Sequence, residues 1–196
     1  MPEDVRLEHL KRILQQIVLY NLNDEVTRRT AENIIDAYEV PQKAWLEEIV
    51  AVWDWVRTEV RYTFDPRGIE RFQTADRTLD TLHGDCDDQA TLVASLLASI
   101  GHEAAIFLCD TNPFAVGRIS HAVAGARLPK PRAPWGRKWI ILETTKDVPF
   151  GWKPKATRWE MVRIDPNDIA EGEDSLMDVD EIPYLQKYRI RFPEVP

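Results

Sequence analysis

A helix marked at both ends is the most constraining feature of this sequence. Residues 84–89 read Gly-Asp-Cys-Asp-Asp-Gln and lead into a mostly apolar run that stops before Gly101. Asp85 is suited to cap the first turn with Asp88 three residues later, and Gly101 is suited to the left-handed conformation that closes a helix. We therefore predict a helix that begins at Cys86, about 22 Å long at 1.5 Å per residue, as the central packing element.

Cys86 occupies the first position of this predicted helix. Free backbone N–H groups and the positive end of the helix dipole stabilise a thiolate there, and a nearby imidazolium lowers the pKa of the thiol further. The carboxylates of Asp85, Asp87 and Asp88 oppose this lowering unless they cap the backbone, pair with arginine or hold a cation. We predict a nucleophilic thiol that iodoacetamide modifies at about pH 6 to 7. Cys109 ends an apolar run and is interpreted as a core residue.

A nucleophilic cysteine needs a base and a group that orients the base. His121 begins one apolar run that is predicted to be a strand, and Glu143 ends another. Neighbouring strands lie about 4.8 Å apart, so the two side chains can meet. Cys86, His121 and Glu143 thus form a candidate nucleophile, base and orienting acid.

The rest of the chain predicts helices first and strands afterwards. Apolar residues spaced by three and four predict helices at about residues 5–18, 25–38 and 42–60. Alternating or continuous apolar runs predict four antiparallel strands at residues 103–109, 120–127, 138–145 and 158–164. The other segments are predicted to be a polar loop at 65–83, a solvent-facing hairpin connection at 128–136, and an acidic loop and tail at 165–196. The fold class is therefore α+β, in a single domain over 1–196 with 1–42 as a helical N-terminal extension.

Composition excludes several classes of protein. The 25 Lys and Arg against 33 Asp and Glu give a net charge of −8, which would repel a phosphate backbone, so no nucleic-acid partner is expected. No apolar run reaches the ~18 residues of a membrane-spanning helix, and the first residues are acidic where a secretory signal would be basic. We therefore expect a cytoplasmic protein with no membrane partner and with reduced cysteines; the sequence does not fix the oligomeric state.

The other histidines, His9, His83 and His102, are predicted to lie on the surface.

Together these motifs resemble the transglutaminase-like superfamily of papain-fold cysteine enzymes, and in particular its bacterial and phage-associated members. The resemblance covers about residues 45–153. It is carried by Gly84-Asp-Cys-Asp-Asp, Gly101-His-Glu-Ala, His121 on a strand, Trp139-Ile-Ile-Leu-Glu-Thr-Thr, and the upstream Val60-Arg-Tyr-Thr-Phe-Asp-Pro and Glu70.

The resemblance implies a papain-like core in which Cys86 is the nucleophile, His121 the base and Glu143 the orienting acid. It also implies acyl transfer or hydrolysis at amide or isopeptide bonds of a protein or peptide, through a thioester. Whether water or an amine accepts the acyl group is left open. The acid of the family is usually aspartate, so the longer Glu143 departs from the pattern, and Asp147 is the fallback for the orienting acid.

No cofactor is required by this chemistry. Some relatives use calcium near the nucleophile, and calcium prefers oxygen ligands, so Asp85, Asp87 and Asp88 form a candidate calcium site alongside their capping interpretation.

Two interpretations from other classes stay open. One is a catalytically inactive binding or assembly module, such as a virion component, that keeps the fold. The other is a zinc site built from His83, Cys86, Cys109 and His121, although the last two are not a closely spaced pair.

Overall fold

The structure is a computed structural model that describes residues 3–66, 71–114 and 118–165. Helices dominate the first half of the chain and strands the second, as the sequence predicts, which confirms the α+β class. The elements are α1 (Glu3–Asn21), α2 (Glu25–Ala37), α3 (Trp45–Glu59), β1 (Arg61–Tyr62), α4 (Ala75–Thr81), β2 (His83–Gly84), α5 (Cys86–Ser99), β3 (Glu103–Cys109), β4 (His121–Arg127), β5 (Ile140–Leu142) and β6 (Trp159–Arg163).

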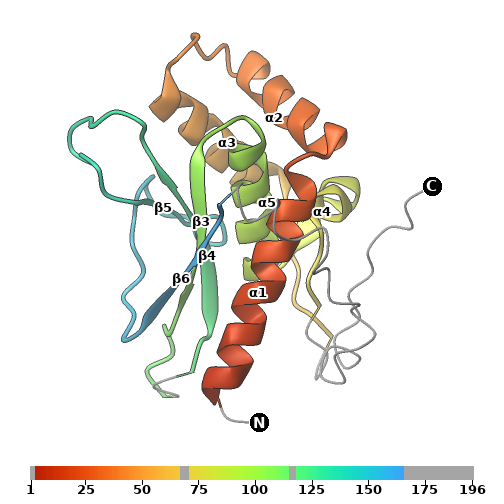
Figure 1. Cartoon of the computed structure of the whole chain (residues 1–196), viewed down its shortest axis with the longest axis vertical. Helices are drawn as coiled ribbons and strands as arrows, with labels where there is room; N and C mark the ends of the chain where they lie inside the picture. The colour runs from red at the N-terminus through yellow and green to blue at the C-terminus, as the bar shows by residue number, and fades with distance from the viewer. Residues whose placement is uncertain (1–2, 67–70, 115–117, 166–196) are drawn as a thin grey trace.

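The main sheet has the strand order β5-β4-β3-β6, and all neighbouring strands are antiparallel. Its register sets Cys109 of β3 across from His121 of β4 and across from Trp159 of β6. The four strands fall within or close to the predicted ranges. In Figure 1 the sheet lies on one side of α5, and helices α1 and α4 lie on the other.

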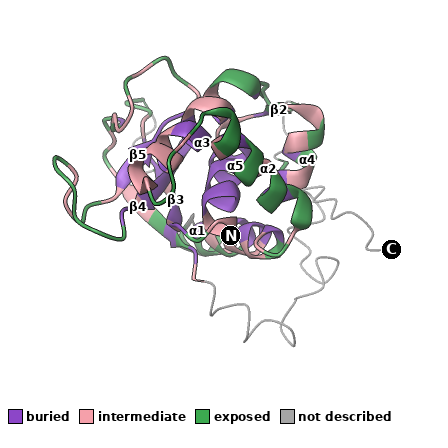
Figure 2. Cartoon of the chain, turned by 90° about the horizontal axis from the view of Figure 1, so that it is seen from above, coloured by how far each residue is buried: buried purple, intermediate pink, exposed green. Residues whose placement is uncertain are grey.

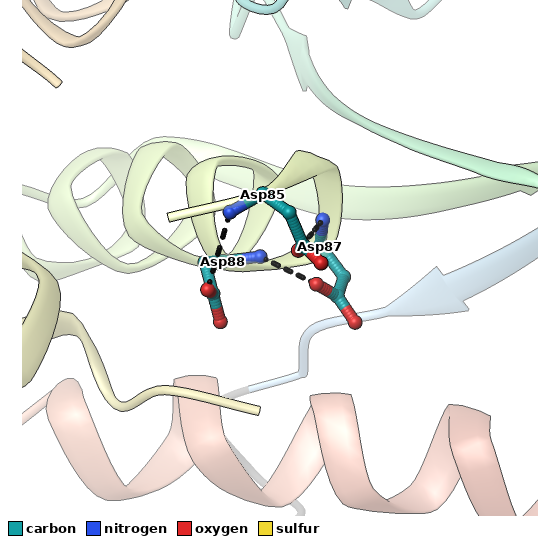
Figure 3. A group of neighbouring side chains, drawn as sticks. All are labelled: Asp85, Asp87 and Asp88. Atoms are coloured by element: carbon teal, nitrogen blue, oxygen red, sulfur yellow. Dashed lines mark hydrogen bonds between the residues drawn. The ribbon is translucent and has the colours of Figure 1, made fainter. Parts of the chain in front are cut away.

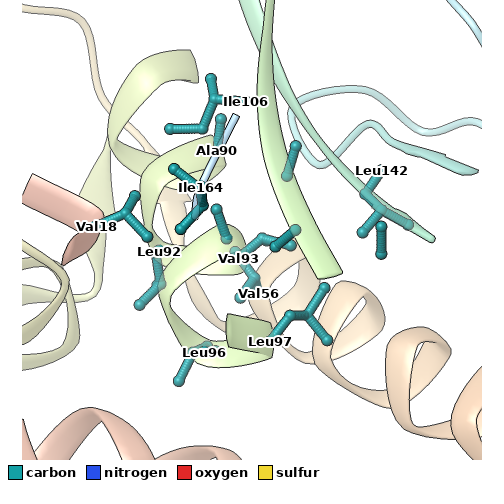
Figure 4. Packing of buried hydrophobic residues seen from close by; sticks show 14 of the residues in the cluster. Val18, Val56, Ala90, Leu92, Val93, Leu96, Leu97, Ile106, Leu142 and Ile164 are labelled. Carbon is teal, nitrogen blue, oxygen red and sulfur yellow. The ribbon is translucent and has the colours of Figure 1, made fainter. Parts of the chain in front are cut away.

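Helix α5 is the centre of the packing. Every residue from Asp87 to Leu97 is buried, because α1, α2, α3 and α4 pack on it from several sides and β3 and β4 from another. Figure 2 shows this helix enclosed by its neighbours. Figure 4 shows Leu92, Val93 and Leu97 of α5 among side chains from α1, α3 and the sheet. A helix that is apolar around most of its circumference needs such a position, so the first residue of α5 is held on a rigid support.

Both ends of α5 carry the predicted caps. The side chain of Asp85 accepts a hydrogen bond from the backbone of the first turn, and the side chain of Asp88 accepts one from the backbone N–H of Asp85, which makes a capping box. At the other end, Gly101 has φ +91°. Its N–H donates to the carbonyl of Ala98 at 3.0 Å, and that of His102 donates to the carbonyl of Leu97 at 3.0 Å, the pattern of a Schellman motif.

The segment before α5 holds more regular structure than the predicted loop at 65–83. It contains α4 and the strand β2, and β2 pairs in parallel with β1, with Tyr62 across from Gly84. Gly84 is required there, because a Cβ atom at this position would lie 2.6 Å from the Cβ atom of Asp88. Glu70 and the predicted acidic tail beyond residue 165 lie outside the described residues.

Among the residues that the structure describes, no helix combines the length and the apolar character needed to cross a membrane.

Candidate active site

The thiol of Cys86 lies at the start of α5 and beside β4. Cys86 is the first helical residue, as predicted, and it is half-buried against the core. Two backbone hydrogen bonds favour its thiolate, one from its own N–H and one from the N–H of Ala122. Ala122 directly follows His121, so the fold brings the nucleophile candidate to the part of β4 that carries the base candidate.

His121 and Glu143 form a buried hydrogen-bonded pair. Nε2 of His121 lies 2.7 Å from Oε2 of Glu143, and the two residues are 8% and 2% exposed. The other carboxylate oxygen, Oε1, accepts hydrogen bonds from the backbone N–H of Thr145 at 2.8 Å and from its hydroxyl at 2.7 Å. Burial raises the pKa of Glu143. The hydrogen bond and charge of His121 lower this pKa, and so do the two hydrogen bonds from Thr145. Together they outweigh burial, so the pKa is lowered and the carboxylate is ionised.

This pairing fixes the tautomer of the imidazole. A carboxylate only accepts hydrogen bonds, so Nε2 of His121 carries the proton that faces Glu143. The hydrogen bonds of the described residues give Nδ1 no partner, so its lone pair is available to accept a proton.

The extra methylene of Glu143 is explained by the register of β4 and β5. Ala124 pairs with Leu142, so continuing the register sets Glu143 across from Val123, two residues from His121. Diagonal neighbours in a sheet are about 7–8 Å apart, and a long side chain spans that gap. Asp147 instead is fully exposed and pairs with Arg57 at 3.1 Å, so the fallback residue is not the partner of His121.

The electrostatics of the thiol differ from the sequence-based expectation. Burial raises the pKa of Cys86, and the negative charges of Asp87 and Asp85 raise it further, whereas the two backbone hydrogen bonds lower it. The net shift is upward, because loss of solvent and two carboxylates outweigh the helix start. This direction is opposite to the lowering expected from the helix start, so the surroundings of Cys86 disfavour the thiolate that the sequence predicts.

Trp53 supports Glu143, and no motif in the sequence points to this role. Its indole Nε1 donates to the backbone carbonyl of Glu143 at 2.7 Å, and the residue is buried in α3. Its spacing in α3 predicts only a core residue. A buried indole needs a hydrogen-bond acceptor, which was the one available signal, but an acceptor 90 residues away cannot be identified from local sequence.

Asp85, Asp87 and Asp88 form one cluster at the start of α5 (Figure 3). Their ligand atoms lie within 4.8 Å of one another, the only such group of metal-binding residue types in the described part of the chain. Asp85 accepts from the N–H of Asp87 at 3.2 Å, and Asp87 accepts from that of Asp88 at 2.9 Å. Asp88 accepts from Gln73, through its N–H at 2.8 Å and its side-chain amide at 2.7 Å. Backbone capping therefore already accounts for these carboxylates.

The zinc interpretation has no support within the described residues. No three of His83, Cys86, Cys109 and His121 bring their ligand atoms together in one group. Cys109 is fully buried in β3, which confirms its interpretation as a core residue.

The surface prediction for His102 is wrong. His102 is 8% exposed, and its Nε2 lies 2.7 Å from Oε2 of Glu48. The residue follows the helix-closing Gly101, where a turn residue would ordinarily be exposed, but α3 supplies a carboxylate partner there.

A cavity of about 610 Å³ opens next to the start of α5. Its lining includes Phe64, Asp65, Arg71, His83 and Gly84. Its volume is in the range of sites that hold a small ligand or a stretch of peptide. Gly84 and Asp88 in the lining flank Cys86 in sequence, but Cys86, His121 and Glu143 are not part of the lining.

The family comparison covers the part of the chain that contains these residues. The description "Transglutaminase-like superfamily" matches residues 28–144, which include Cys86, His121 and Glu143. The chain belongs to the transglutaminase-like superfamily, and its α+β fold is the one expected for that family. The match is to the superfamily as a whole, so the placement among phage-associated members stays a prediction. No curated protein matches the chain.

Solved structures give more distant likenesses. A "putative cysteine protease" from Cytophaga hutchinsonii is 20% identical, with a TM-score of 0.44 over 63% of this chain and 39% of that one. A "putative protease" from Parabacteroides distasonis is 13% identical, with a TM-score of 0.49 over 69% and 26%. LapG of Legionella pneumophila is 17% identical, with a TM-score of 0.45 over 69% and 73%. The chain thus spans well under half the length of the first two, and at these identities and TM-scores the likeness assigns no activity to it.

Proposed function

We propose that this chain is a cysteine-dependent hydrolase or acyl transferase that acts on amide or isopeptide bonds of a protein or peptide through a thioester. The observation that supports this most strongly is the buried 2.7 Å pair of His121 and Glu143 on the strand beside the thiol of Cys86. A thiol beside the strand that carries an imidazole, with the tautomer of that imidazole fixed by a carboxylate, is suited to general-base activation.

In the proposed first step, Nδ1 of His121 takes the proton of the Cys86 thiol as the sulfur attacks the substrate carbonyl carbon. The S–C bond forms, and the π electrons of the C=O bond move onto the oxygen, which the backbone N–H of Cys86 stabilises. The oxyanion then collapses, the C–N bond breaks, and the leaving amine takes the proton from His121. Glu143 holds the imidazolium that exists between these transfers.

In the proposed second step, water or a primary amine attacks the thioester of Cys86. His121 takes a proton from the attacking group, the C–S bond breaks, and the sulfur regains a proton. Water gives a carboxylic acid and defines a hydrolase, whereas an amine gives a new amide and defines a crosslinking enzyme. The difference between the two activities is the access of the acceptor to the thioester.

The substrate that we propose is a peptide segment of a protein, and two features support it. The cavity beside Gly84 has the volume of a short peptide stretch. Phe64 in its lining is 81% exposed and contacts Tyr62 edge to face, with ring centroids 5.0 Å apart. Aromatic surfaces of this kind contact peptide side chains with little loss of conformational entropy.

The proposed chemistry is carried by side chains of this chain and needs no metal. Calcium at Asp85, Asp87 and Asp88 remains the alternative use of that cluster. Turnover compared in EGTA and in millimolar calcium separates the two: equal rates are expected from capping alone, and a rate that depends on calcium would assign the carboxylates to the ion.

The test is mass spectrometry of products from a library of glutamine-containing peptides, with and without an added primary amine. We expect products that require Cys86, deamidated or cleaved when water is the acceptor and amine-linked when the amine is. Cys86→Ala should abolish them while keeping its thermal unfolding midpoint, and Cys109→Ala is the matched control that keeps them. No product from any peptide would favour the inactive binding module instead.

A further inference from the structure

The carboxylate of Glu143 is held from two directions. Its Oε2 lies 2.7 Å from Nε2 of His121, and its Oε1 accepts from the N–H of Thr145 at 2.8 Å and from the hydroxyl of Thr145 at 2.7 Å. An ionised carboxylate only accepts hydrogen bonds, so both groups of Thr145 are donors. Within the described residues, two of the three hydrogen bonds to this carboxylate therefore come from Thr145.

A bend after β5 brings Thr145 back to the side chain of Glu143. Strand β5 ends at Leu142, and the bend begins at Thr145. In a continuing strand, residues two positions apart would be separated by about 6.5 Å along the strand, and the contact would be lost. The backbone before the bend is itself fixed, because Nε1 of Trp53 donates to the carbonyl of Glu143 at 2.7 Å. The local fold thus presents Thr145 to the carboxylate at a defined place.

The length of Glu143 gives this second contact its importance. A glutamate side chain has one more rotatable bond than an aspartate side chain, and its last torsion has broad preferences, so the carboxylate can occupy many positions. With Oε1 bound to Thr145, the other oxygen is left facing His121. Thr145 therefore removes the freedom that the extra methylene adds.

We propose that Thr145 is a positioning residue for the imidazole base: its hydroxyl and N–H fix the carboxylate of Glu143 with one oxygen directed at His121. The relevance of this role to catalysis rests on the proposed function. Thr145 forms and breaks no covalent bond in either step, and it acts only through Glu143, which holds the imidazolium between the proton transfers.

The test compares two substitutions of the same residue. Thr145→Val keeps the shape of the side chain and the backbone N–H but removes the hydroxyl, whereas Thr145→Ser keeps the hydroxyl. Thr144→Val is the matched control, because Thr144 is the neighbouring threonine, is 8% exposed, and has no hydrogen bond to Glu143 within the described residues. Thermal unfolding of each variant shows whether the fold is kept.

The first readout is proton NMR of the resting chain, which needs no turnover. A proton held between an imidazole and a carboxylate resonates downfield of other N–H protons, and its loss in His121→Ala identifies the signal of His121. The buried pair of His102 and Glu48, at 2.7 Å, supplies an internal reference. We expect Thr145→Val to move the His121 signal upfield and to leave the His102 signal unchanged. Thr145→Ser and Thr144→Val should leave both signals in place.

The second readout is steady-state kinetics on the best peptide from the product assay. We expect Thr145→Val to lower kcat/KM about three- to tenfold, mainly through kcat, because Glu143 keeps its charge and the N–H of Thr145 still donates. Thr145→Ser should restore the wild-type rate. In a Glu143→Ala background, Thr145→Val should have no further effect, as expected for a residue that acts through Glu143.

Two results would overturn the assignment. An unchanged His121 signal and an unchanged rate in Thr145→Val would remove Thr145 from the site. A loss that Thr145→Ser does not restore, or a shift of the His102 signal together with the unfolding midpoint, would show a packing role only. Failure of the proposed function is a separate outcome: a wild-type chain that forms no product from any peptide would overturn the activity, and the NMR comparison would still decide whether Thr145 holds the carboxylate.

Discussion

Replacing Glu143 by glutamine and by alanine separates the charge of the orienting residue from its presence. Glutamine keeps the volume and one acceptor oxygen for Nε2 of His121 but removes the charge. A hydrogen bond to a charged group contributes about 1.5–3 kcal/mol and a neutral one about 0.5–1.5 kcal/mol, so the difference is about 1–1.5 kcal/mol. At 1.36 kcal/mol per tenfold, Glu143→Gln should lower kcat/KM about tenfold.

Alanine removes more, because the carboxylate is buried and its hydrogen-bond donors are shielded from solvent. Glu143 is 2% exposed, and its loss leaves the N–H of the His121 ring and two donors of Thr145 without an acceptor. We expect Glu143→Ala to lower kcat/KM by about 10²–10³-fold, with a lower unfolding midpoint as well.

The assay is steady-state kinetics on the best peptide, with urea unfolding of each variant. We expect kcat/KM to fall in the order wild type, Glu143→Gln, Glu143→Ala. We expect KM to change little from wild type to Glu143→Gln, because the charge matters only when the imidazole is protonated. Wild-type kcat/KM for Glu143→Gln, or equal rates for glutamine and alanine, would refute a role of the carboxylate charge.

Further predictions concern the support and the electrostatics of the site. Trp53→Phe removes the indole donor to the backbone carbonyl of Glu143 and should cost about 1–3 kcal/mol of unfolding free energy, measured by urea denaturation; an unchanged value would mean that the carbonyl finds another donor. Burial and the charge of Asp85 raise the pKa of Asp88 to about 7, above its unfolded value, so its contribution to stability is complete below about pH 4 and is lost as the pH rises through about 7. Thermal unfolding from pH 4 to 8 should show this loss in the wild type and not in Asp88→Asn, and parallel curves would contradict it. Alkylation of Cys86 by iodoacetamide should be slow at pH 7, should rise above about pH 9, and should be faster in Asp87→Asn; complete labelling at about pH 6 to 7 would restore the thiolate predicted from the helix start.

The sequence predicted the framework of the candidate site because the signals for it are local. Asp85 and Gly101 define the ends of α5 by their own side chain and backbone preferences, so Cys86 had to be the first helical residue. The apolar runs around His121 and Glu143 identified β4 and β5 in the same way. The contact between His121 and Glu143 required only that β4 and β5 pair with each other in the sheet.

The features that the sequence did not predict depend on contacts between distant segments. Strand β1 has two residues, too few for a period, and exists because Tyr62 pairs with Gly84 across 22 positions. Trp53 and His102 have partners 90 and 54 residues away. The pKa of the Cys86 thiol depends on how deeply the whole fold buries it, and a capping pattern contains no information about that depth.

The central claim is that the sulfur of Cys86 becomes acylated with His121 as the base, and a single measurement addresses it. The chain is mixed with an activated ester of the best peptide, so that acylation outruns hydrolysis, and is quenched in acid within milliseconds for peptide mass mapping. We expect an acyl mass on Cys86 that hydroxylamine removes, formed at least about 10²-fold more slowly in His121→Ala. An acyl group on any other residue, or equal rates in the two proteins, would contradict it.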